Sequence, residues 1–223
     1  MVELACFAGT LAAYAVALAI RGRTSIPLAN PTLIAILAVG AVLGLTGLDY
    51  GRYEDATAPI SFLLGPAVVA LAVPLHQERS TLLEHGRSLL AGAVLGAGAA
   101  MLLGYAASRA LALDDAFTLA LTTRTATSPI AIAIADGLHQ APALSAVMSI
   151  ASGIAGATWG PAILDRLGVR LPVARGLALG LTAHGIGTAR MLEESRAAGA
   201  SSSVGMGLGG LLVALVVPGL WGS

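Results

Sequence analysis

Apolar stretches alternate with short polar joints along the whole chain. Each stretch runs for about 17 to 22 residues, close to the roughly 20 that an α-helix needs to cross the hydrocarbon core of a bilayer. The eight stretches are residues 4–20, 31–48, 58–75, 88–108, 116–135, 143–164, 173–191 and 203–220. This pattern predicts an all-α polytopic membrane protein with about eight transmembrane segments. Because the joints are too short to fold by themselves, residues 1–223 are expected to form a single transmembrane domain.

Three of the eight stretches contain residues that interrupt helices. Pro129 interrupts the fifth stretch, the sequence HGIG at residues 184–187 interrupts the seventh, and Pro66 and Pro74 interrupt the third. Backbone groups freed by a break are tolerated inside a membrane only where they face protein or a water-filled cavity. We therefore expect several segments that are broken near the midplane and meet at a shared cavity. The sequence leaves open whether each of them spans the membrane or re-enters.

Two kinds of repetition occur along the chain. A broken segment, a charged joint and a glycine-rich helix follow one another at residues 63–104 and again at residues 181–219, which favours a two-repeat transporter architecture. Glycines also recur at four-residue spacing, as Gly40 and Gly44, Gly92 and Gly96, Gly156 and Gly160, Gly176 and Gly180, and Gly205 and Gly209. Such small faces let helix backbones approach closely in lipid. We expect them to pack the helices of one bundle, and a homo-oligomer interface is the alternative.

Composition excludes a soluble domain. Hydrophobic residues make up 57% of the chain and charged residues 11%, whereas soluble domains carry about 25% charged residues. The formal net charge is zero, which gives no reason to expect nucleic acid as a partner. The single cysteine, Cys6, has no partner for a disulfide, and the sequence contains neither a metal-ligand cluster nor an HExxH or nucleotide-binding motif. We therefore expect no enzymatic activity, no metal and no cofactor.

The most polar cluster inside an apolar stretch is TTRTATSP, residues 122–129. Ser128 and Pro129 form a helix-start signal, with serine as the N-cap and proline at the first helical position. A helix that begins near the midplane would present its N–H groups and the positive end of its dipole to an anion. Arg124 adds a full positive charge, which at mid-bilayer costs on the order of 3 kcal/mol and normally faces a cavity or a partner. The alternatives are a structural ion pair with Asp115 or Asp136, and a position nearer the membrane surface.

A second polar cluster is LTAHGIGTAR, residues 181–190. His184 lies within an apolar stretch, Gly185 is expected to loosen the helix beside it, and Thr182 and Thr188 supply hydroxyl groups. A buried histidine can donate to a carboxylate or carry a proton near neutral pH. The alternative is a histidine whose ring is satisfied by neighbouring backbone. Arg190 is expected at the membrane edge.

Four stretches resemble the LrgB/CidB family of bacterial membrane proteins. They are PAVVALAVPL at residues 66–75, RTATSPIA at 124–131, ARGLALG at 174–180 and AHGIGTAR at 183–190. The last two in tandem are the most specific, and the similarity extends over most of the chain. The family typically has lysine where this sequence has Arg124, a change that keeps the charge but alters its geometry. It often has tyrosine at the position of His76.

The resemblance implies one of two functions. One is transport of small 2-hydroxy or 2-keto monocarboxylates such as glycolate, glycerate, lactate or pyruvate, coupled to protons or sodium; the plastidial glycolate/glycerate translocator contains a similar half. The other is an antiholin-like modulation of murein hydrolase activity and cell lysis. Both imply a separate LrgA/CidA-like small membrane protein as partner and a multi-pass location in the cytoplasmic (inner) membrane. For transport, Thr125 and Thr127 are candidates to bond the 2-hydroxyl group. The full set of candidate substrate-binding residues is Arg124, Thr125, Thr127, Ser128, Thr182, His184, Gly185 and Thr188.

Overall fold

The computed structural model describes residues 2–24 and 29–221, and within these ranges all regular secondary structure is helical. The chain divides into two compact units, Met1–Ala72 and Val73–Ser223. The first unit contains α1 (Val2–Arg23), α2 (Pro31–Thr46), α3 (Tyr50–Phe62) and α4 (Leu64–Ala70), and α5 (Ala72–Gln77) begins at its end. The second contains α6 (Arg79–Glu84), α7 (Gly86–Ala110), α8 (Asp115–Thr123), α9 (Ser128–Gly137), α10 (Pro142–Arg166), α11 (Pro172–Glu194) and α12 (Arg196–Trp221).

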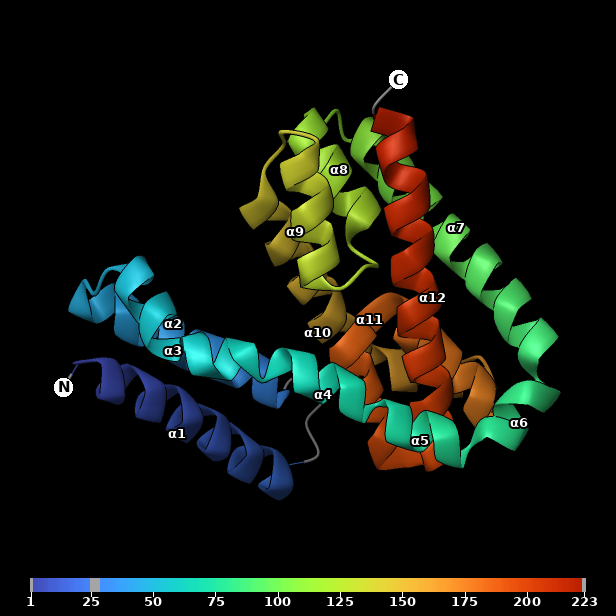
Figure 1. Cartoon of the computed structure of the whole chain (residues 1–223), viewed down its shortest axis with the longest axis horizontal. Coiled ribbons are helices and arrows are strands. Elements are labelled where there is room, and N and C mark those ends of the chain that lie inside the picture. Colours follow the sequence, from blue (N-terminus) through green and yellow to red (C-terminus); the bar gives the residue numbers. More distant parts are fainter. Residues whose placement is uncertain (1, 25–28, 222–223) are drawn as a thin grey trace. The chain divides into compact units, whose positions relative to one another are not determined.

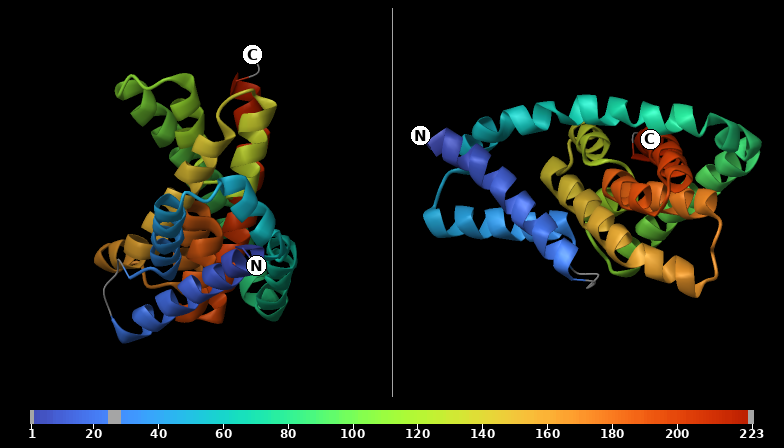
Figure 2. Two further views of the ribbon diagram at one scale, coloured as in Figure 1. Left: turned by 90° about the vertical axis from the view of Figure 1, so that its left-hand side faces the viewer. Right: turned by 90° about the horizontal axis from the view of Figure 1, so that it is seen from below.

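The first unit is a layer of helices with almost no buried interior. Helix α1 packs beside α2 and α3, as the right-hand view of Figure 2 shows. A hydrogen bond of 2.9 Å joins the hydroxyl groups of Thr10 on α1 and Tyr53 on α3. Ala17 is the only buried residue of α1 and Thr57 the only one of α3. Apolar side chains exposed in this way are stable in lipid, so the exposure supports a membrane setting.

At the third predicted break the helix is interrupted twice, but the chain does not reverse. The helical assignment is interrupted at Leu63 and Leu71, three residues before Pro66 and Pro74 respectively, yet both residues keep right-handed helical angles. Their N–H groups bond to the carbonyl three residues back, a local tightening expected where a proline ring displaces the preceding turn. Residues Tyr50–Gln77 therefore remain one apolar helix, 28 residues long.

Glycines allow close packing in the second unit, as predicted. A Cβ atom at Gly176 or Gly180 of α11 would overlap backbone carbonyl groups of α12, and one at Gly92 or Gly96 of α7 would press on leucines of α11. The contacts of the two α11 glycines fall on the first half of α12, and Figure 1 shows α12 continuing past α11 toward the C-terminus. The pair Gly40 and Gly44 differs, because a Cβ atom at either position would meet nothing within 4 Å.

Helix α11 is a hairpin that turns back on itself. His184 has φ 40° and ψ −124°, outside the helical region, and the arms on either side of it run in opposite directions. Arg175 near the start of α11 and Glu194 at its end are joined by an ion pair of 2.9 Å. Gly187 in the second arm lies against the carbonyl of Leu179 in the first. We call Pro172–Glu194 the second hairpin. The predicted break near Gly185 is present, but it falls on His184 and reverses the chain.

Helices α8 and α9 form the first hairpin, residues 115–137. In Figure 1, α8 runs from the end of α7 toward the middle of the unit and α9 runs back. The start of α8 is tied to the end of α7 by an ion pair of 3.8 Å between Arg109 and Asp115. The end of α9 lies beside the end of α12, where Leu138 and Pro218 line one shallow pocket. The break predicted at Pro129 is therefore also a re-entrant turn.

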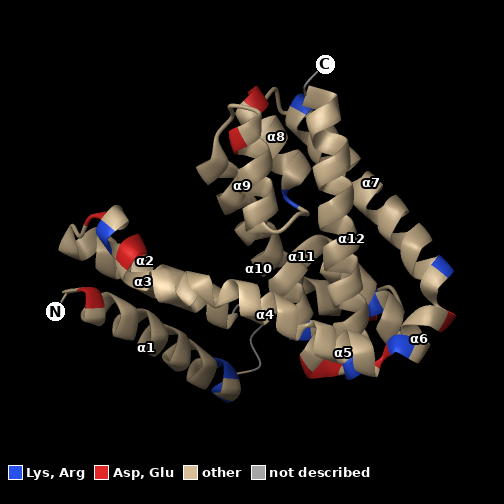
Figure 3. Ribbon diagram, viewed as in Figure 1, with Lys and Arg blue, Asp and Glu red and all other residues tan. Residues whose placement is uncertain are grey.

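The two hairpins and the short helix α2 explain why the expected count of about eight crossings is not confirmed, because α2 has only 16 residues. Five described helices are long and apolar enough to span a membrane: Val2–Arg23, Tyr50–Gln77, Gly86–Ala110, Pro142–Arg166 and Arg196–Trp221. Charged residues gather at the ends of α7, α10 and α12 (Figure 3). The repeat expected between residues 63–104 and 181–219 is not found in that register, because only the second of these stretches contains a reversal.

Candidate functional site

The tips of the two hairpins meet inside the second unit. The ring Nε2 of His184, at the tip of the second hairpin, lies 3.0 Å from the backbone carbonyl oxygen of Arg124, at the tip of the first. Because a carbonyl only accepts hydrogen bonds, Nε2 is the donor. His184 is 5% exposed. The sequence left open that neighbouring backbone satisfies the His184 ring, and the structure shows this for Nε2. Nδ1 makes no hydrogen bond within the described residues.

Helix α10 holds both tips through two serines one turn apart. Ser149 donates to the carbonyl oxygen of Ala126 in the first tip at 2.6 Å. Ser152 donates to the carbonyl oxygen of Thr182 beside the second tip at 3.0 Å. Gly153 follows, and a Cβ atom there would come within 3.3 Å of the His184 ring. The sequence analysis missed these residues, and their signal was two serines at i, i+3 spacing within an apolar helix.

Arg124 is anchored by backbone carbonyl groups and not by an acid. Its Nη1 donates to the carbonyl oxygens of Leu121 at 2.8 Å and Ala100 at 3.4 Å. No ion pair to Arg124 and no hydrogen bond to its Nε or Nη2 occurs within residues 2–24 and 29–221. Asp115, a proposed structural partner, pairs with Arg109 instead. The guanidinium group thus keeps free donors on the side of the fork that suits a carboxylate.

Gly104 of α7 makes room for this arginine. A Cβ atom at Gly104 would overlap both the carbonyl group of Leu121 and Nη1 of Arg124. The sequence analysis did not single out this glycine, since nothing in the local pattern separates it from the other glycines of α7. It sets how closely α7 approaches the first tip, and so where the charge lies.

Arg124 lines a cavity of about 640 Å³ that we call the α10 cavity. Thr125 from the first tip, Thr182 from the second hairpin and Ser152 from α10 also line it, and the remaining wall is mostly apolar. A volume of this order accommodates a small ligand. The hydroxyl oxygen of Thr125 is buried without a hydrogen-bond partner among the described residues, which leaves an unused polar group beside the arginine.

The remaining four candidate residues lie outside the α10 cavity. Thr127, and not Ser128, is the N-cap residue of α9, and no side chain caps that helix; the cap was predicted one residue too late. Ser128 donates to Ser149 at 3.4 Å. Thr188 donates to the carbonyl oxygen of His184 at 2.8 Å and lies 2.9 Å from the hydroxyl of Ser202. Gly185 is exposed. None of these four residues lines the α10 cavity.

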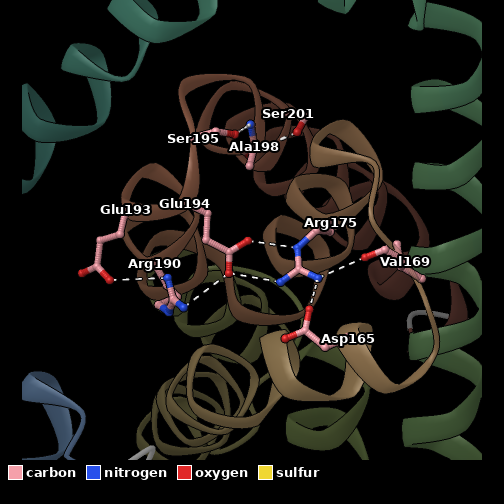
Figure 4. A network of polar contacts seen from close by, with 9 residues as sticks. All are labelled: Asp165, Val169, Arg175, Arg190, Glu193, Glu194, Ser195, Ala198 and Ser201. Atoms are coloured by element: carbon pink, nitrogen blue, oxygen red, sulfur yellow. Dashed lines mark hydrogen bonds and ion pairs between the residues drawn. The ribbon is translucent and has the colours of Figure 1, made fainter. Parts of the chain in front are cut away.

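The base of the second hairpin is closed by ion pairs, shown in Figure 4. Arg175 is 8% exposed and holds Glu194 with Nε and Nη2, at 2.9 and 3.2 Å, and Asp165 with Nη1 at 2.7 Å. Arg190 pairs with Glu193 and Glu194 at 3.5 and 3.3 Å. This cluster joins the end of α10 to both arms of the hairpin. Within the described residues no group of three or more metal-ligating side chains occurs.

Comparison with known proteins identifies the family. The model of the LrgB-like family matches residues 10–222. The chain belongs to the LrgB-like family. An uncharacterized protein, YxaC of Bacillus subtilis, is 33% identical over 89% of this chain and 86% of its own length. The holin-like protein CidB of Staphylococcus epidermidis is 28% identical over 94% and 91%, and the antiholin-like protein LrgB of Bacillus subtilis is 26% identical over 85% and 82%.

The family match confirms the resemblance drawn from the four sequence stretches. Two of these three relatives are named holin-like and antiholin-like, and these names favour the lysis-related alternative over transport of a particular monocarboxylate. Together with the five apolar helices, they establish a membrane protein. No solved structure matches the chain.

Proposed function

We propose that this protein carries small organic anions across the membrane, with the carboxylate bound by Arg124 at the meeting point of the hairpin tips. The supporting observation is a permanent charge without a counter-charge. Arg124 lines the α10 cavity, its Nη1 is held by two carbonyl groups, and its other donors are free among the described residues. An arginine within a membrane protein is costly unless it faces a partner. A monocarboxylate supplies that partner when it binds.

The order of elements supports a carrier. Helix α7 is followed by a hairpin that enters from its far end, and α10 is followed by a hairpin that enters from the opposite end. We propose that α7 with the first hairpin and α10 with the second form two inverted repeats. Broken helices from inverted repeats that meet near the midplane are a common way to build a substrate site in transporters. This assignment replaces the repeat register expected from the sequence.

The substrate class follows from the groups around Arg124. The hydroxyl of Thr125, beside the charge, is buried and makes no hydrogen bond within the described residues. Rotation of this side chain toward the cavity would let the hydroxyl bond a 2-hydroxy acid such as glycolate, glycerate or lactate, and the apolar wall suits a short carbon chain. Pyruvate would use the carboxylate contact alone. We propose coupling to a proton or sodium gradient, residence in the cytoplasmic (inner) membrane, one transmembrane domain and an LrgA/CidA-like partner protein.

Uptake by purified protein in liposomes tests this proposal, with labelled glycolate and pyruvate under proton or sodium gradients, alone and with the partner. Arg124→Lys should keep partial uptake, because the charge survives while the planar fork is lost. Arg124→Gln should abolish uptake without unfolding the protein. Arg190→Gln is the matched control, because it removes an arginine that lies outside the cavity. Normal uptake by Arg124→Gln would contradict the proposal, as would misfolding of both Arg124 variants.

A second candidate function is holin-like or antiholin-like control of cell lysis. The observation that favours it is the similarity of the chain to a holin-like protein, CidB, and an antiholin-like protein, LrgB. Under this function, loss of the protein should change the autolysis rate of cells, and Arg124→Gln should restore the wild-type rate as well as the unaltered protein does. If Arg124→Gln fails in both the uptake and the lysis assays, carriage of the anion underlies the lysis phenotype.

A further inference from the structure

A second cavity, of about 670 Å³, lies between α7, α8 and α12, and we call it the α12 cavity. Its walls include Met101, Thr118 and Thr122. Toward its outer end it reaches Arg109 and Asp115, joined at 3.8 Å, and Tyr105 and Trp221, whose rings meet edge to face with centroids 6.1 Å apart. These four residues mark the base of the first hairpin. The α12 cavity therefore extends toward the side from which the first hairpin enters.

The α10 cavity extends in the opposite direction. Its lining follows α10 from Met148 to Leu164, and the next residue, Asp165, is bound to Arg175 at the base of the second hairpin. Helix α10 begins just after the first hairpin and ends just before the second. The two cavities thus start from opposite sides of the unit and approach each other near the hairpin tips.

The partition between the cavities is thin and contains Arg124. On α7, Ala100 lines the α10 cavity while its neighbour Met101 lines the α12 cavity. On the first hairpin, Thr122 lines the α12 cavity while Arg124 lines the α10 cavity. The hydrogen bond from Arg124 Nη1 to the carbonyl oxygen of Ala100 joins the first tip to α7. At 3.4 Å it is longer than an ordinary N–H···O bond, and therefore weak.

We infer that the α10 and α12 cavities are the two halves of one route for a small anion, and that the Arg124 guanidinium is the partition between them. The identity of the anion rests on the proposed function, whereas the two-sided route rests on the cavities alone. An anion bound at Nε and Nη2 of Arg124 competes with the Ala100 carbonyl oxygen for the positive charge of the guanidinium group. Releasing that weaker bond, while the 2.8 Å bond to Leu121 persists, lets the side chain face either cavity.

Single cysteines and a charged, membrane-impermeant methanethiosulfonate reagent test the route. Cys6 is the only cysteine of the chain, so a Cys6→Ser background is free of thiols. Gly98→Cys probes the α12 cavity and Ala155→Cys the α10 cavity. A Cβ atom at Gly98 meets nothing within 4 Å, and the same holds at Gly207 of α12, which lines neither cavity. Gly207→Cys is therefore the matched control.

Two loop cysteines identify the sides, because Leu111 and Leu167 are 69% and 71% exposed next to the two hairpin bases. We expect Gly98→Cys to react only from the side of Leu111→Cys, and Ala155→Cys only from the side of Leu167→Cys. Gly207→Cys should react from neither side. Adding Arg124→Ala should make Gly98→Cys reactive from both sides, because the partition is then lost.

Reaction of both cavity cysteines from the same side, or of neither, would overturn the two-sided route. If Gly98→Cys does not fold, Tyr105→Cys probes the same cavity. Labelling needs no substrate, so the two proposals fail separately. Opposite-side labelling with no uptake of glycolate or pyruvate would retain the route and reject the substrate class. Uptake together with labelling of both cavity cysteines from the same side would retain the substrate class and reject the two-sided route.

Discussion

The ring Nε2 of His184 lies 3.0 Å from the backbone carbonyl oxygen of Arg124, a residue 60 positions earlier in the chain. This contact joins the tips of two hairpins that enter from opposite sides. It also places a histidine where the chain turns with φ 40°, a conformation that costs a residue other than glycine about 1–3 kcal/mol. The strain and the hydrogen bond occur in the same residue, so the bond and the surrounding packing hold the turn in place.

Two substitutions at His184 separate the ring from the backbone. His184→Ala removes the bond and keeps the strain, whereas His184→Gly removes both. Because glycine adopts positive φ freely, the glycine variant should be more stable than the alanine variant by about 1 kcal/mol. Thermal unfolding in detergent measures the difference. An alanine variant as stable as the glycine variant would mean that residue 184 does not adopt this turn.

Gly104 and Gly98 form a matched pair on α7. Gly104→Ala should destabilise the protein by about 1–3 kcal/mol, because a Cβ atom there overlaps the Leu121 carbonyl and Arg124 Nη1. Gly98→Ala should be neutral or stabilising by up to about 1 kcal/mol, because its Cβ atom meets nothing within 4 Å and alanine favours helix. Thermal unfolding compares the two. Equal stability of both variants would contradict the close approach of α7 to the first tip.

Much of this architecture is readable from the sequence because lipid imposes simple rules. Apolar runs predicted the ends of α1, α2, α7 and α10 to within three residues, whereas α12 begins at Arg196, seven residues before the predicted start. A proline after a serine and a histidine beside glycines marked both interruptions. The sequence did not distinguish spanning from re-entry, since a broken 20-residue segment has the same composition in either case. That distinction depends on contacts such as the one between Arg175 and Glu194.

The candidate site was predictable in part for the same reason. Arg124 was evident as a charge in an apolar stretch, and its surroundings were not. One of the carbonyl groups that hold its guanidinium, that of Ala100, and the glycine that admits it, Gly104, belong to α7, a helix more than 10 residues away whose pattern carries no local mark. Pro66 and Pro74 interrupt their helix without reversing the chain, because proline bends a membrane helix as readily as it breaks one.

At the base of the second hairpin, the planar guanidinium group of Arg175 contacts two acids at once. Arg175→Lys should destabilise the protein by about 2–3 kcal/mol, because an ammonium group cannot hold Glu194 with two donors and also reach Asp165. Arg190→Lys should change stability by less than about 1 kcal/mol, because its ion pairs are more exposed. Thermal unfolding at low and high salt measures both. Similar losses in the two variants would show that charge alone, without the fork, closes the hairpin.

Substitution of Thr125 separates an effect on stability from an effect on ligand recognition. Its hydroxyl oxygen is buried and makes no hydrogen bond within the described residues, so Thr125→Val should leave stability unchanged or raise it by about 1 kcal/mol. Thr188→Val is the control, because the Thr188 hydroxyl is bonded to His184 and Ser202 and its loss should cost about 1 kcal/mol. If Thr125 bonds the 2-hydroxyl group of a substrate, Thr125→Val should reduce glycolate uptake while pyruvate uptake persists, since pyruvate lacks that hydroxyl. A Thr125→Val protein that is less stable than Thr188→Val, or that loses both substrates equally, would assign Thr125 to the packing of the first tip.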